Sequence, residues 1–283
     1  MSVNPEKSYK RSIVVVFILR IILITEKVLP QKVFGNFYNF SFSIYRKMIR
    51  IYYLRRYLLF FLIRDANKIG RTKNVFKTMP YSLVGWRGLE ATHDTVYDVG
   101  VQNLIGDLVE CGVAQGGCAA LMALANEYSK GNRHIWLFDS FEGLPEPTAK
   151  DYVDNKTGNH FRPLPKGACL GTLDQVSELL FEHFQFDSNN ISLIKGWFQD
   201  TLPIAGKDIQ NIAVLRLDGD WYDSTLCCLK NLFPKVVKGG YIIIDDYFSC
   251  FGSRKAVDEY LSLENRIYEL IPDGRGGVYF KKI

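Results

Sequence analysis

The stretch that decides the expected fold reads Ala213-Val214-Leu215-Arg216-Leu217-Asp218-Gly219-Asp220-Trp221-Tyr222-Asp223. Its first half is short, largely apolar and rich in branched side chains, which is typical of a buried parallel strand, and it stops at an acidic turn. A second apolar run, residues 241–244, ends in the same way at Asp245 and Asp246. Ligands of open α/β sheets bind at the carboxyl ends of the strands, so we expect both turns to lie at the functional edge of one sheet.

Four carboxylates converge at that edge if the two strands are neighbours: those of Asp218, Asp220, Asp245 and Asp246. Such a group repels itself unless a cation or shared protons relieve the repulsion. Ligands that are all oxygens suit a hard ion such as Mg²⁺. The alternative interpretation is that the four acids merely cap the helices that follow them, a common role of Asp.

The length and charge of the chain indicate one large domain with an appendage. Its 283 residues are too few for two large α/β domains. The formal net charge is only +5, but residues 1–64 hold twelve Lys and Arg against Glu6 and Glu26, which leaves residues 65–283 at −5. We therefore expect a basic, apolar helical arm over 1–64 and a catalytic domain over 65–283.

The arm contains two apolar runs. Basic residues precede the run 13–24, which lacks a small-residue cleavage site, is shorter than the roughly 20 residues of a membrane span and contains Arg20. Five basic residues precede the second run, 57–63. Two interpretations stay open: a helix lying on an anionic membrane surface, or a helix that packs on the domain or on a second subunit of a homo-oligomer.

The six cysteines form no Cys-x-x-Cys pair and have no His at zinc spacing. This pattern is typical of reduced thiols in a reducing compartment, so it favours a cytoplasmic protein, with the arm allowing contact with the inner face of the membrane. Nothing in the sequence indicates a nucleic-acid partner.

From residue 106 onward, strand-like and helix-like segments alternate, which predicts a mostly parallel α/β sheet. The strands expected besides the two acidic ones are 107–111, 134–138 and 191–195, and the helices are 116–130, 173–184 and 253–263. Residues 142–171, with four prolines and four glycines, are expected to form a loop or lid. Residues 266–271 and 278–282 are expected to pair as a terminal hairpin.

A glycine-rich turn over residues 110–117 follows the first strand and opens a helix. Its G-x-x-x-G-G spacing lacks the dinucleotide fingerprint G-x-G-x-x-G. Glu110 precedes the turn, where it could face a cationic part of a ligand, and Asp139 ends the next strand, where an acid can bind a ribose diol. This combination favours S-adenosylmethionine over NAD, although both acids could simply cap helices.

Five motifs occur in order along the chain: residues 110–117, 138–145, 196–203, 215–220 with its Asp218-Gly219-Asp220 turn, and 244–247. Together they resemble the macrocin O-methyltransferase family, the metal-dependent sugar O-methyltransferases of macrolide and related biosynthesis. The resemblance covers about residues 79–283 and leaves the arm out.

The resemblance implies a Rossmann-like class I methyltransferase fold. We therefore expect a mostly parallel seven-stranded sheet with the C-terminal antiparallel hairpin, and the N-terminal helical arm in addition to this fold. The resemblance also implies S-adenosylmethionine as methyl donor and Mg²⁺ bound by Asp220, Asp245 and Asp246, with Asp220 also the general base. The donor-binding positions that carry over are Glu110, Gly112, Gly116, Asp139, Ser140, Gly196 and Phe198.

The expected reaction is methyl transfer to a sugar hydroxyl, with residues 146–170 closing over the acceptor and His160 as a candidate contact. The basic arm favours a lipid-linked or polysaccharide sugar over a small soluble macrolide. A catechol acceptor, whose neighbouring oxygens also chelate a metal, is one alternative. A membrane-surface binding module without catalysis is another.

Overall fold

A seven-stranded sheet forms the centre of the computed structural model, which describes residues 25, 28, 31–159 and 164–283. The strand order is β3-β2-β1-β4-β5-β7-β6. Strands β1 to β5 run parallel, and β7 is antiparallel to both β5 and β6. Their bounds are Asp107–Cys111 (β1), Ile135–Asp139 (β2), Ile191–Lys195 (β3), Ile212–Leu217 (β4), Val236–Ile244 (β5), Ile271–Pro272 (β6) and Val278–Lys281 (β7). The predicted α/β architecture with an antiparallel C-terminal end is confirmed.

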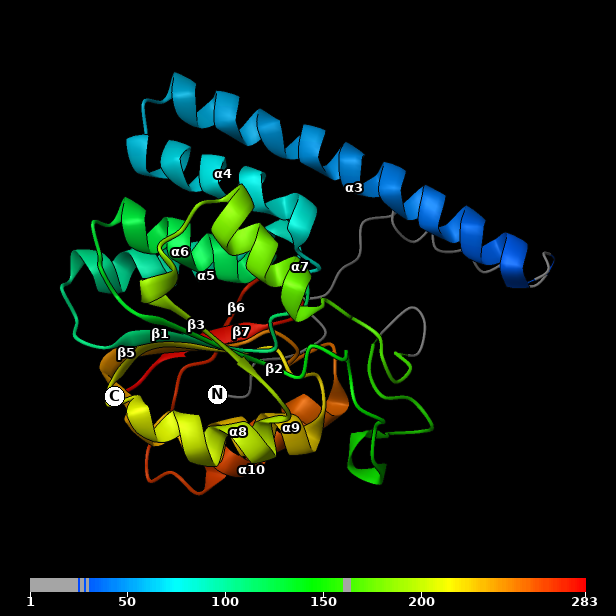
Figure 1. The fold of residues 1–283 in the computed structure, drawn as a ribbon, viewed down its shortest axis with the longest axis vertical. Coiled ribbons are helices and arrows are strands. Elements are labelled where there is room, and N and C mark those ends of the chain that lie inside the picture. Colours follow the sequence, from blue (N-terminus) through cyan, green and yellow to red (C-terminus); the bar gives the residue numbers. More distant parts are fainter. Residues whose placement is uncertain (1–24, 26–27, 29–30, 160–163) are drawn as a thin grey trace.

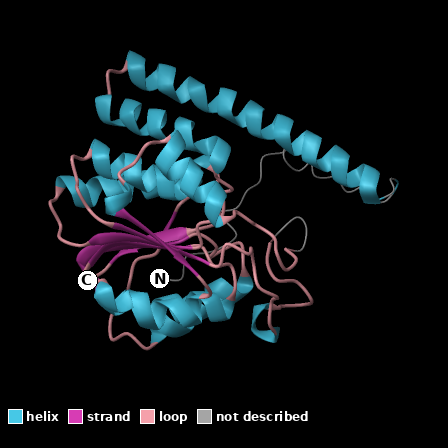
Figure 2. Cartoon of the chain, viewed as in Figure 1, coloured by secondary structure: helices cyan, strands magenta, loops and turns pink. Residues whose placement is uncertain are grey.

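Helices cover both faces of the sheet (Figures 1 and 2). The helices α4, α5, α6 and α7 lie over one face, and α8, α9 and α10 lie over the other. The long helix α3 lies outside this layer, on top of α4. Their bounds are Gln31–Leu62 (α3), Ala66–Thr78 (α4), Trp86–Val101 (α5), Gly117–Tyr128 (α6), Leu173–Ser177 (α7), Phe198–Ala205 (α8), Tyr222–Leu232 (α9) and Phe251–Ser262 (α10).

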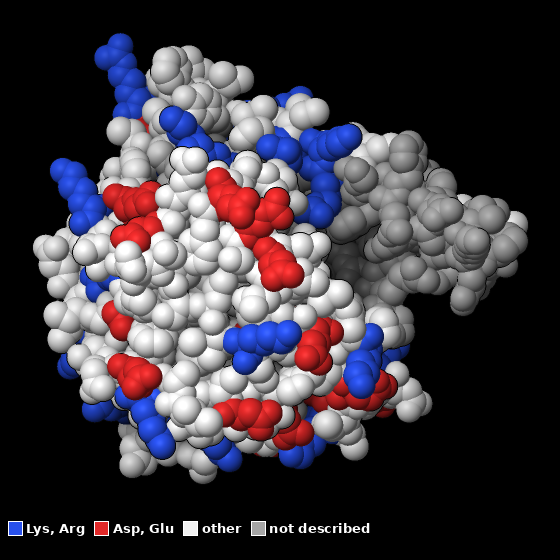
Figure 3. Space-filling model, in the orientation of Figure 1, with Lys and Arg blue, Asp and Glu red and all other residues white. Residues whose placement is uncertain are grey.

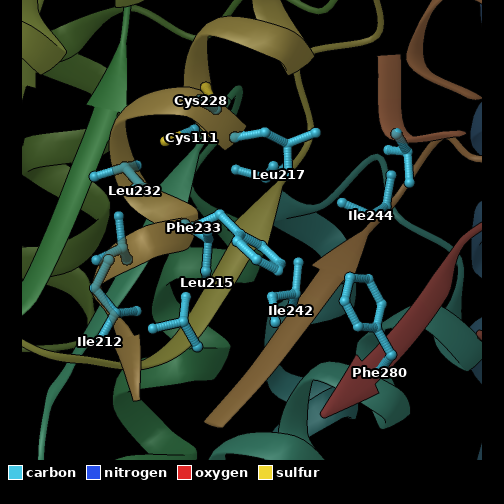
Figure 4. Packing of buried hydrophobic residues seen from close by; sticks show 14 of the residues in the cluster. Cys111, Ile212, Leu215, Leu217, Cys228, Leu232, Phe233, Ile242, Ile244 and Phe280 are labelled. Carbon is cyan, nitrogen blue, oxygen red and sulfur yellow. The ribbon is translucent and has the colours of Figure 1, made fainter. Parts of the chain in front are cut away.

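Strand β4 is buried along its whole length because helices cover both of its faces. Leu215 and Leu217 pack with Phe280 of β7 in the core beneath α8, α9 and α10 (Figure 4). On the other face, Val214 packs with Ile243 of β5 in the core beneath α5 and α6. The near-continuous apolar character of the strand follows from this double burial, and only its single charged residue departs from it.

Three of the predicted elements differ from the structure. The strand expected over residues 241–244 begins five residues earlier, because β5 comprises Val236–Ile244. The hairpin was expected to begin at residue 266, but β6 comprises only Ile271 and Pro272. Pro272 has no N–H to donate to a ladder, which limits it to a short edge strand. The helix expected over 173–184 is present, but it becomes a π-helix over Glu178–His183.

Helix α3 is the described part of the basic arm, while the apolar run 13–24 lies outside the described residues. Helix α3 packs on the domain through Tyr53, which is fully buried and donates a hydrogen bond to Glu90 Oε1 of α5 at 3.0 Å. Arg56 Nη2 lies 3.1 Å from Glu90 Oε2. Within the part of the chain that the structure describes, no helix is long and apolar enough to cross a membrane.

Candidate active site

The carboxyl ends of β4 and β5 lie side by side, which is the arrangement that an acidic cluster needs. Leu217 of β4 pairs with Ile244 of β5, so the turns that follow both strands begin at the same level. Asp220, Asp245 and Asp246 are all buried there. Asp218 is part of the same cluster, with 22% of its side chain exposed.

The four carboxylates divide into two groups that share Asp246. One oxygen each from Asp218, Asp245 and Asp246 lie within 4.8 Å of one another. A second group of the same size joins Asp220, Asp246 and the sulfur of Cys250. The predicted trio of Asp220, Asp245 and Asp246 is therefore split between the two groups, and Asp218 takes the third position beside Asp245 and Asp246.

Arg216 is fully buried in β4 and contacts acids on both sides. Its Nη2 atom donates to Asp218 Oδ2 and to Asp245 Oδ1, each at 2.9 Å. Its Nε atom lies 3.3 Å from Glu110 Oε1 of β1 and 2.9 Å from Cys118 Sγ of α6. This one guanidinium connects the acidic cluster with the glycine-rich turn.

A second arginine holds the same aspartate from the opposite side. Arg275 lies in the turn between β6 and β7, and its Nη1 atom pairs with Asp245 Oδ2. Burial alone would raise the pKa of Asp245, but Arg275 and Arg216 outweigh it, so the pKa of this carboxyl is lowered. Asp245 is thus the member of the cluster that stays ionised most readily.

The other acids of the cluster hold their protons more strongly. Burial, followed by the charge of Asp218, raises the pKa of Asp220 to about 8. Burial, followed by the charges of Asp220 and Asp245, raises the pKa of Asp246 to about 7. Four aspartates face two arginines, so the cluster has negative charge that protons or a cation must balance.

The cluster fits a divalent cation. Asp246 Oδ1 accepts from Ser249 Oγ at 2.9 Å, whereas Asp246 Oδ2 is buried and has no hydrogen-bond partner among the described residues. A buried carboxylate oxygen without a partner is costly. Because Asp218 and Asp245 place further oxygens within 4.8 Å of one another and of Asp246, this donor set matches the oxygen-only preference of Mg²⁺.

The glycine-rich turn lies directly against the acidic cluster. Gly112 has a φ of +92°, and a Cβ atom there would lie 1.9 Å from the backbone oxygen of Asp218. Gly116, with a φ of +81°, caps the N-terminus of α6. Glycine is therefore required at both positions, because a side chain would either collide or be held in a disfavoured conformation.

Asp139 and Ser140 lie beside this turn at the end of β2, as predicted for donor contacts. Asp139 Oδ2 accepts from the backbone N–H groups of Val113 at 2.6 Å and Ala114 at 3.1 Å, so the carboxylate also holds the turn in shape. Ser140 Oγ donates to the carbonyl of Gly143 at 3.2 Å.

Glu110 has no exposed surface, and its carboxylate faces Arg216 from the neighbouring strand. Burial raises the pKa of Glu110 to about 8, against the opposing effect of Arg216. The residue was expected to face a ligand directly. Its position instead indicates that it acts on the site through Arg216.

Gly196 and Phe198 follow β3, on the far side of β2. Gly196 has a φ of +144°, and Phe198 is the first residue of α8. The Phe198 ring reaches the acidic turn, because a Cβ atom at Gly219 would lie 3.2 Å from Phe198 Cε2. Six of the seven predicted donor-binding residues thus belong to the carboxyl ends of β1, β2 and β3 or to the turns that follow these strands, and the seventh, Phe198, opens the helix after β3.

The predicted loop over 142–171 packs on the same edge of the sheet. Leu144 forms a small apolar cluster with Trp221 and Cys250, which follow β4 and β5. Trp221 Nε1 donates to the carbonyl of Pro145 at 3.0 Å. His160 lies outside the described residues.

Sequence reasoning missed three residues that shape this site: Arg216, Arg275 and Asp151. Asp151 is fully buried in the loop and accepts from the backbone N–H of Tyr222 at 2.7 Å, at the start of α9. One signal was available, since a charged residue inside an apolar strand, as Arg216 is, is rare unless it is paired. Arg275 and Asp151 lie in turns whose sequences contain no such signal.

Comparison with known proteins agrees with the family resemblance of the sequence motifs. The family model described as Macrocin-O-methyltransferase (TylF) matches residues 60–282. The chain is 36% identical over 224 residues to the demethyldecarbamoylnovobiocin O-methyltransferase of Streptomyces niveus. The aligned residues cover 77% of this chain and 83% of that enzyme. It is 36% identical over 198 residues to the 8-demethyl-8-(2,3-dimethoxy-alpha-L-rhamnosyl)-tetracenomycin-C 4'-O-methyltransferase of Streptomyces olivaceus, over 69% of this chain and 72% of that enzyme.

Among solved structures, the O-methyltransferase NovP matches with a TM-score of 0.63 and 38% sequence identity, over 71% of this chain and 82% of that chain. The calicheamicin methyltransferase CalS11 matches with a TM-score of 0.55 and 22% identity, over 68% of this chain and 77% of that chain, a likeness of fold.

Proposed function

The chain belongs to the macrocin O-methyltransferase family, and on that premise we propose that this O-methyltransferase moves a methyl group from S-adenosylmethionine to a sugar hydroxyl with the help of a divalent cation. The observation that carries the proposal is the contact between the glycine-rich turn and the acidic cluster. A donor at the turn and a hydroxyl at the cluster would be close enough to react.

The donor site in this proposal is built around Gly112, Gly116, Asp139 and Ser140. The N–H groups at the start of α6, which have no partner within the helix, and the carboxylate of Asp139 would suit the polar parts of S-adenosylmethionine. The negative charge of the cluster favours a cationic sulfonium over a pyrophosphate. Gly196 and Phe198 would border the same site from β3 and α8.

Asp218, Asp245 and Asp246 are the proposed metal ligands. Asp220 belongs to the neighbouring group, which shares Asp246, so its carboxylate lies close to this site. A divalent cation bound there would polarise the acceptor hydroxyl and lower its pKa. Arg216 and Arg275 hold Asp245 in a fixed orientation, which keeps one ligand of the set preorganised.

Asp220 is the proposed general base. It lies in the second group, is buried, and accepts a weak hydrogen bond from Cys250 Sγ at 3.5 Å. It would take the proton of the acceptor hydroxyl as the oxygen bonds to the methyl carbon and the methyl–sulfur bond breaks, releasing S-adenosylhomocysteine. Proximity of the two substrates would supply much of the acceleration.

A sugar acceptor is supported by one relative in particular. The Streptomyces olivaceus enzyme is named for methylation of a compound that carries a rhamnosyl group. Residues 1–59 of the basic arm lie outside the match to the family model, and their charge favours a sugar that is attached to a lipid carrier or a polysaccharide.

The test is methyl transfer from isotopically labelled S-adenosylmethionine to a panel of acceptors: nucleotide sugars, lipid-linked saccharides and a catechol. We expect a labelled sugar product that requires Mg²⁺ and disappears in chelator. The variant Asp220→Asn should transfer far less methyl, because it lacks the proposed base. Asp223→Asn is its matched control, because Asp223 lies nearby but its carboxylate is 55% exposed and pairs with Lys150 at 2.8 Å. Transfer to the catechol alone would contradict the sugar assignment, and donor binding without transfer to any acceptor would favour the binding module.

A further inference from the structure

Helix α3 has two apolar faces, and only one of them is covered. The inner face carries Tyr53 and Phe60, which are buried against the domain. Arg46 Nη2 fixes the same face by donating to the carbonyl of Pro80 at 2.6 Å. A surface helix normally has one apolar face directed toward the core and a polar face toward water.

The outer face carries a second row of large apolar side chains, here called the outer stripe. Its members are between 42% and 77% exposed: Ile44, Met48, Ile51, Leu58 and Leu62. At 3.6 residues per turn these positions lie on one side of the helix, opposite Tyr53. Rows of exposed apolar side chains on a soluble domain mark an interaction surface.

Positive charge surrounds the outer stripe. Residues 31–78, which span α3 and α4, contain eleven Lys and Arg and a single acid, Asp65. Lys47, Arg55 and Arg64 are exposed and form no ion pair within the described part of the chain. In Figure 3, several blue side chains lie beside the pale surface at the top of the molecule, where red ones are few, whereas blue and red side chains are mixed over the domain below.

We propose that the outer stripe of α3 docks on the surface of an anionic lipid membrane, with the helix lying in the plane of the interface. Leu58 and Leu62 would enter the boundary between headgroups and acyl chains, while Lys47 and Arg55 would contact lipid phosphates. Buried apolar area and electrostatic attraction would then act together.

Charge favours a membrane over a second copy of this chain. A two-fold contact through the stripe would bring α3 of one copy against α3 of the other, and α3 contains no acid to pair with Arg55 or Lys47. Like charges brought together at an interface are unfavourable. An anionic bilayer instead supplies both the apolar medium and the opposite charge.

The experiment is flotation of the full chain with vesicles of phosphatidylcholine alone or with added phosphatidylglycerol, at increasing salt. The chain should float with the anionic vesicles only, and less so as salt rises. The double change Leu58→Asp with Leu62→Asp should weaken partition by at least about tenfold, because it removes two leucines that the membrane would bury and adds two charges that the anionic lipid repels. Arg55→Glu keeps the apolar stripe and should also weaken binding, most clearly at low salt.

The matched control is Leu263→Asp with Ile267→Asp, since these leucine and isoleucine side chains are 83% and 91% exposed and lie away from α3. This control should float like the unchanged chain. Equal flotation of the Leu58/Leu62 variant and the unchanged chain would overturn the proposal, as would no flotation at all. A fall in mass from dimer to monomer on changing Leu58 and Leu62, measured by sedimentation without lipid, would show that a second copy covers the stripe and would also overturn it.

Discussion

Arg216 links the glycine-rich turn and the acidic cluster through charge. Its guanidinium lies within 3.3 Å of Glu110 and within 2.9 Å of Asp218 and Asp245, and it is fully buried. Replacing it by Met leaves three acids without this partner, so we expect a loss of about 3–5 kcal/mol in the free energy of unfolding. Urea denaturation measures this change.

The pairing of Arg216 with Glu110 can be separated from its other contacts by a second substitution. Glu110 Oε1 makes its closest charged contact, 3.3 Å, with Arg216 Nε. The double variant Arg216→Met with Glu110→Gln should therefore be destabilised by less than the sum of the two single variants. Strict additivity would show that Glu110 does not depend on Arg216.

Asp220 is the residue on which the proposed proton transfer rests. Asp220→Asn keeps the size of the side chain and one oxygen but removes the basic lone pair, so turnover should fall by about 10²–10⁴-fold. Donor affinity, measured by titration calorimetry, should stay unchanged because the proposed donor contacts lie at the ends of β1, β2 and β3 and in the segments that follow them, not in the turn that holds Asp220. If excess Mg²⁺ restores full turnover, Asp220 is a metal ligand and the base is another residue.

The acids of this site could be predicted from sequence, but their partners could not. Asp218, Asp220, Asp245 and Asp246 follow apolar strands, and strand order in the chain makes their convergence a reasonable prediction. Which three oxygens come together depends on turn geometry, and so Asp218 rather than Asp220 joins Asp245. Arg275 reaches Asp245 across 30 residues of sequence, which no local pattern indicates.

At the scale of single elements, the turn between β1 and α6 lies against the backbone of Asp218. Gly112→Ala should destabilise the chain because the new Cβ would overlap the backbone oxygen of Asp218. Gly167→Ala is the matched control, since Gly167 also has positive φ, +79°, but a Cβ added there would meet no atom within 4 Å. We expect the control to cost about 1–2 kcal/mol from backbone strain alone. Gly112→Ala should cost at least about 1–3 kcal/mol more from overpacking.

Urea unfolding of both variants distinguishes strain from collision, and calorimetry with S-adenosylmethionine adds a functional measurement. Donor binding should weaken in Gly112→Ala and persist in Gly167→Ala. Equal stability losses in the two variants would mean that the turn relaxes away from Asp218, contrary to this account of the site.

Most strands of the α/β alternation and one of its helices were predicted closely, although β5 begins five residues before its expected start. Strands β1, β3 and β4 and helix α6 lie within about two residues of their expected bounds. The terminal hairpin was overestimated because residues 266–270 resemble a strand in composition, while Pro272 and the edge position limit pairing to two residues. No sequence pattern distinguishes the π-helix over Glu178–His183 from an ordinary α-helix.

At the scale of the whole molecule, charge asymmetry predicts that residues 1–64 form an arm distinct from the catalytic domain, and this division stays a prediction. The sequence left open whether this arm packs on the domain or lies on a membrane. The structure places Tyr53 inward, so α3 packs on the domain through one face, while the exposed outer stripe leaves membrane contact as a proposal for the other face. Amphipathicity alone could not separate the two interpretations, because both faces of α3 are apolar.

Metal binding should change the stability of the whole domain, and the sign of one substitution should depend on the metal. In chelator, Asp246→Asn should match or exceed the unchanged chain in thermal stability, because it removes a buried charge that Asp220 and Asp245 repel. Saturating Mg²⁺ should stabilise the unchanged chain by about 2.7 kcal/mol when the metal is at 100 times its dissociation constant. The Asn variant, which lacks one charged ligand, should gain much less, so the order of stability should reverse.

Asp223→Asn, outside the cluster, should respond to Mg²⁺ like the unchanged chain. Thermal unfolding with Mg²⁺ and with chelator measures all three proteins without reference to turnover, and identical midpoints in both conditions would show that the four aspartates share protons and hold no metal.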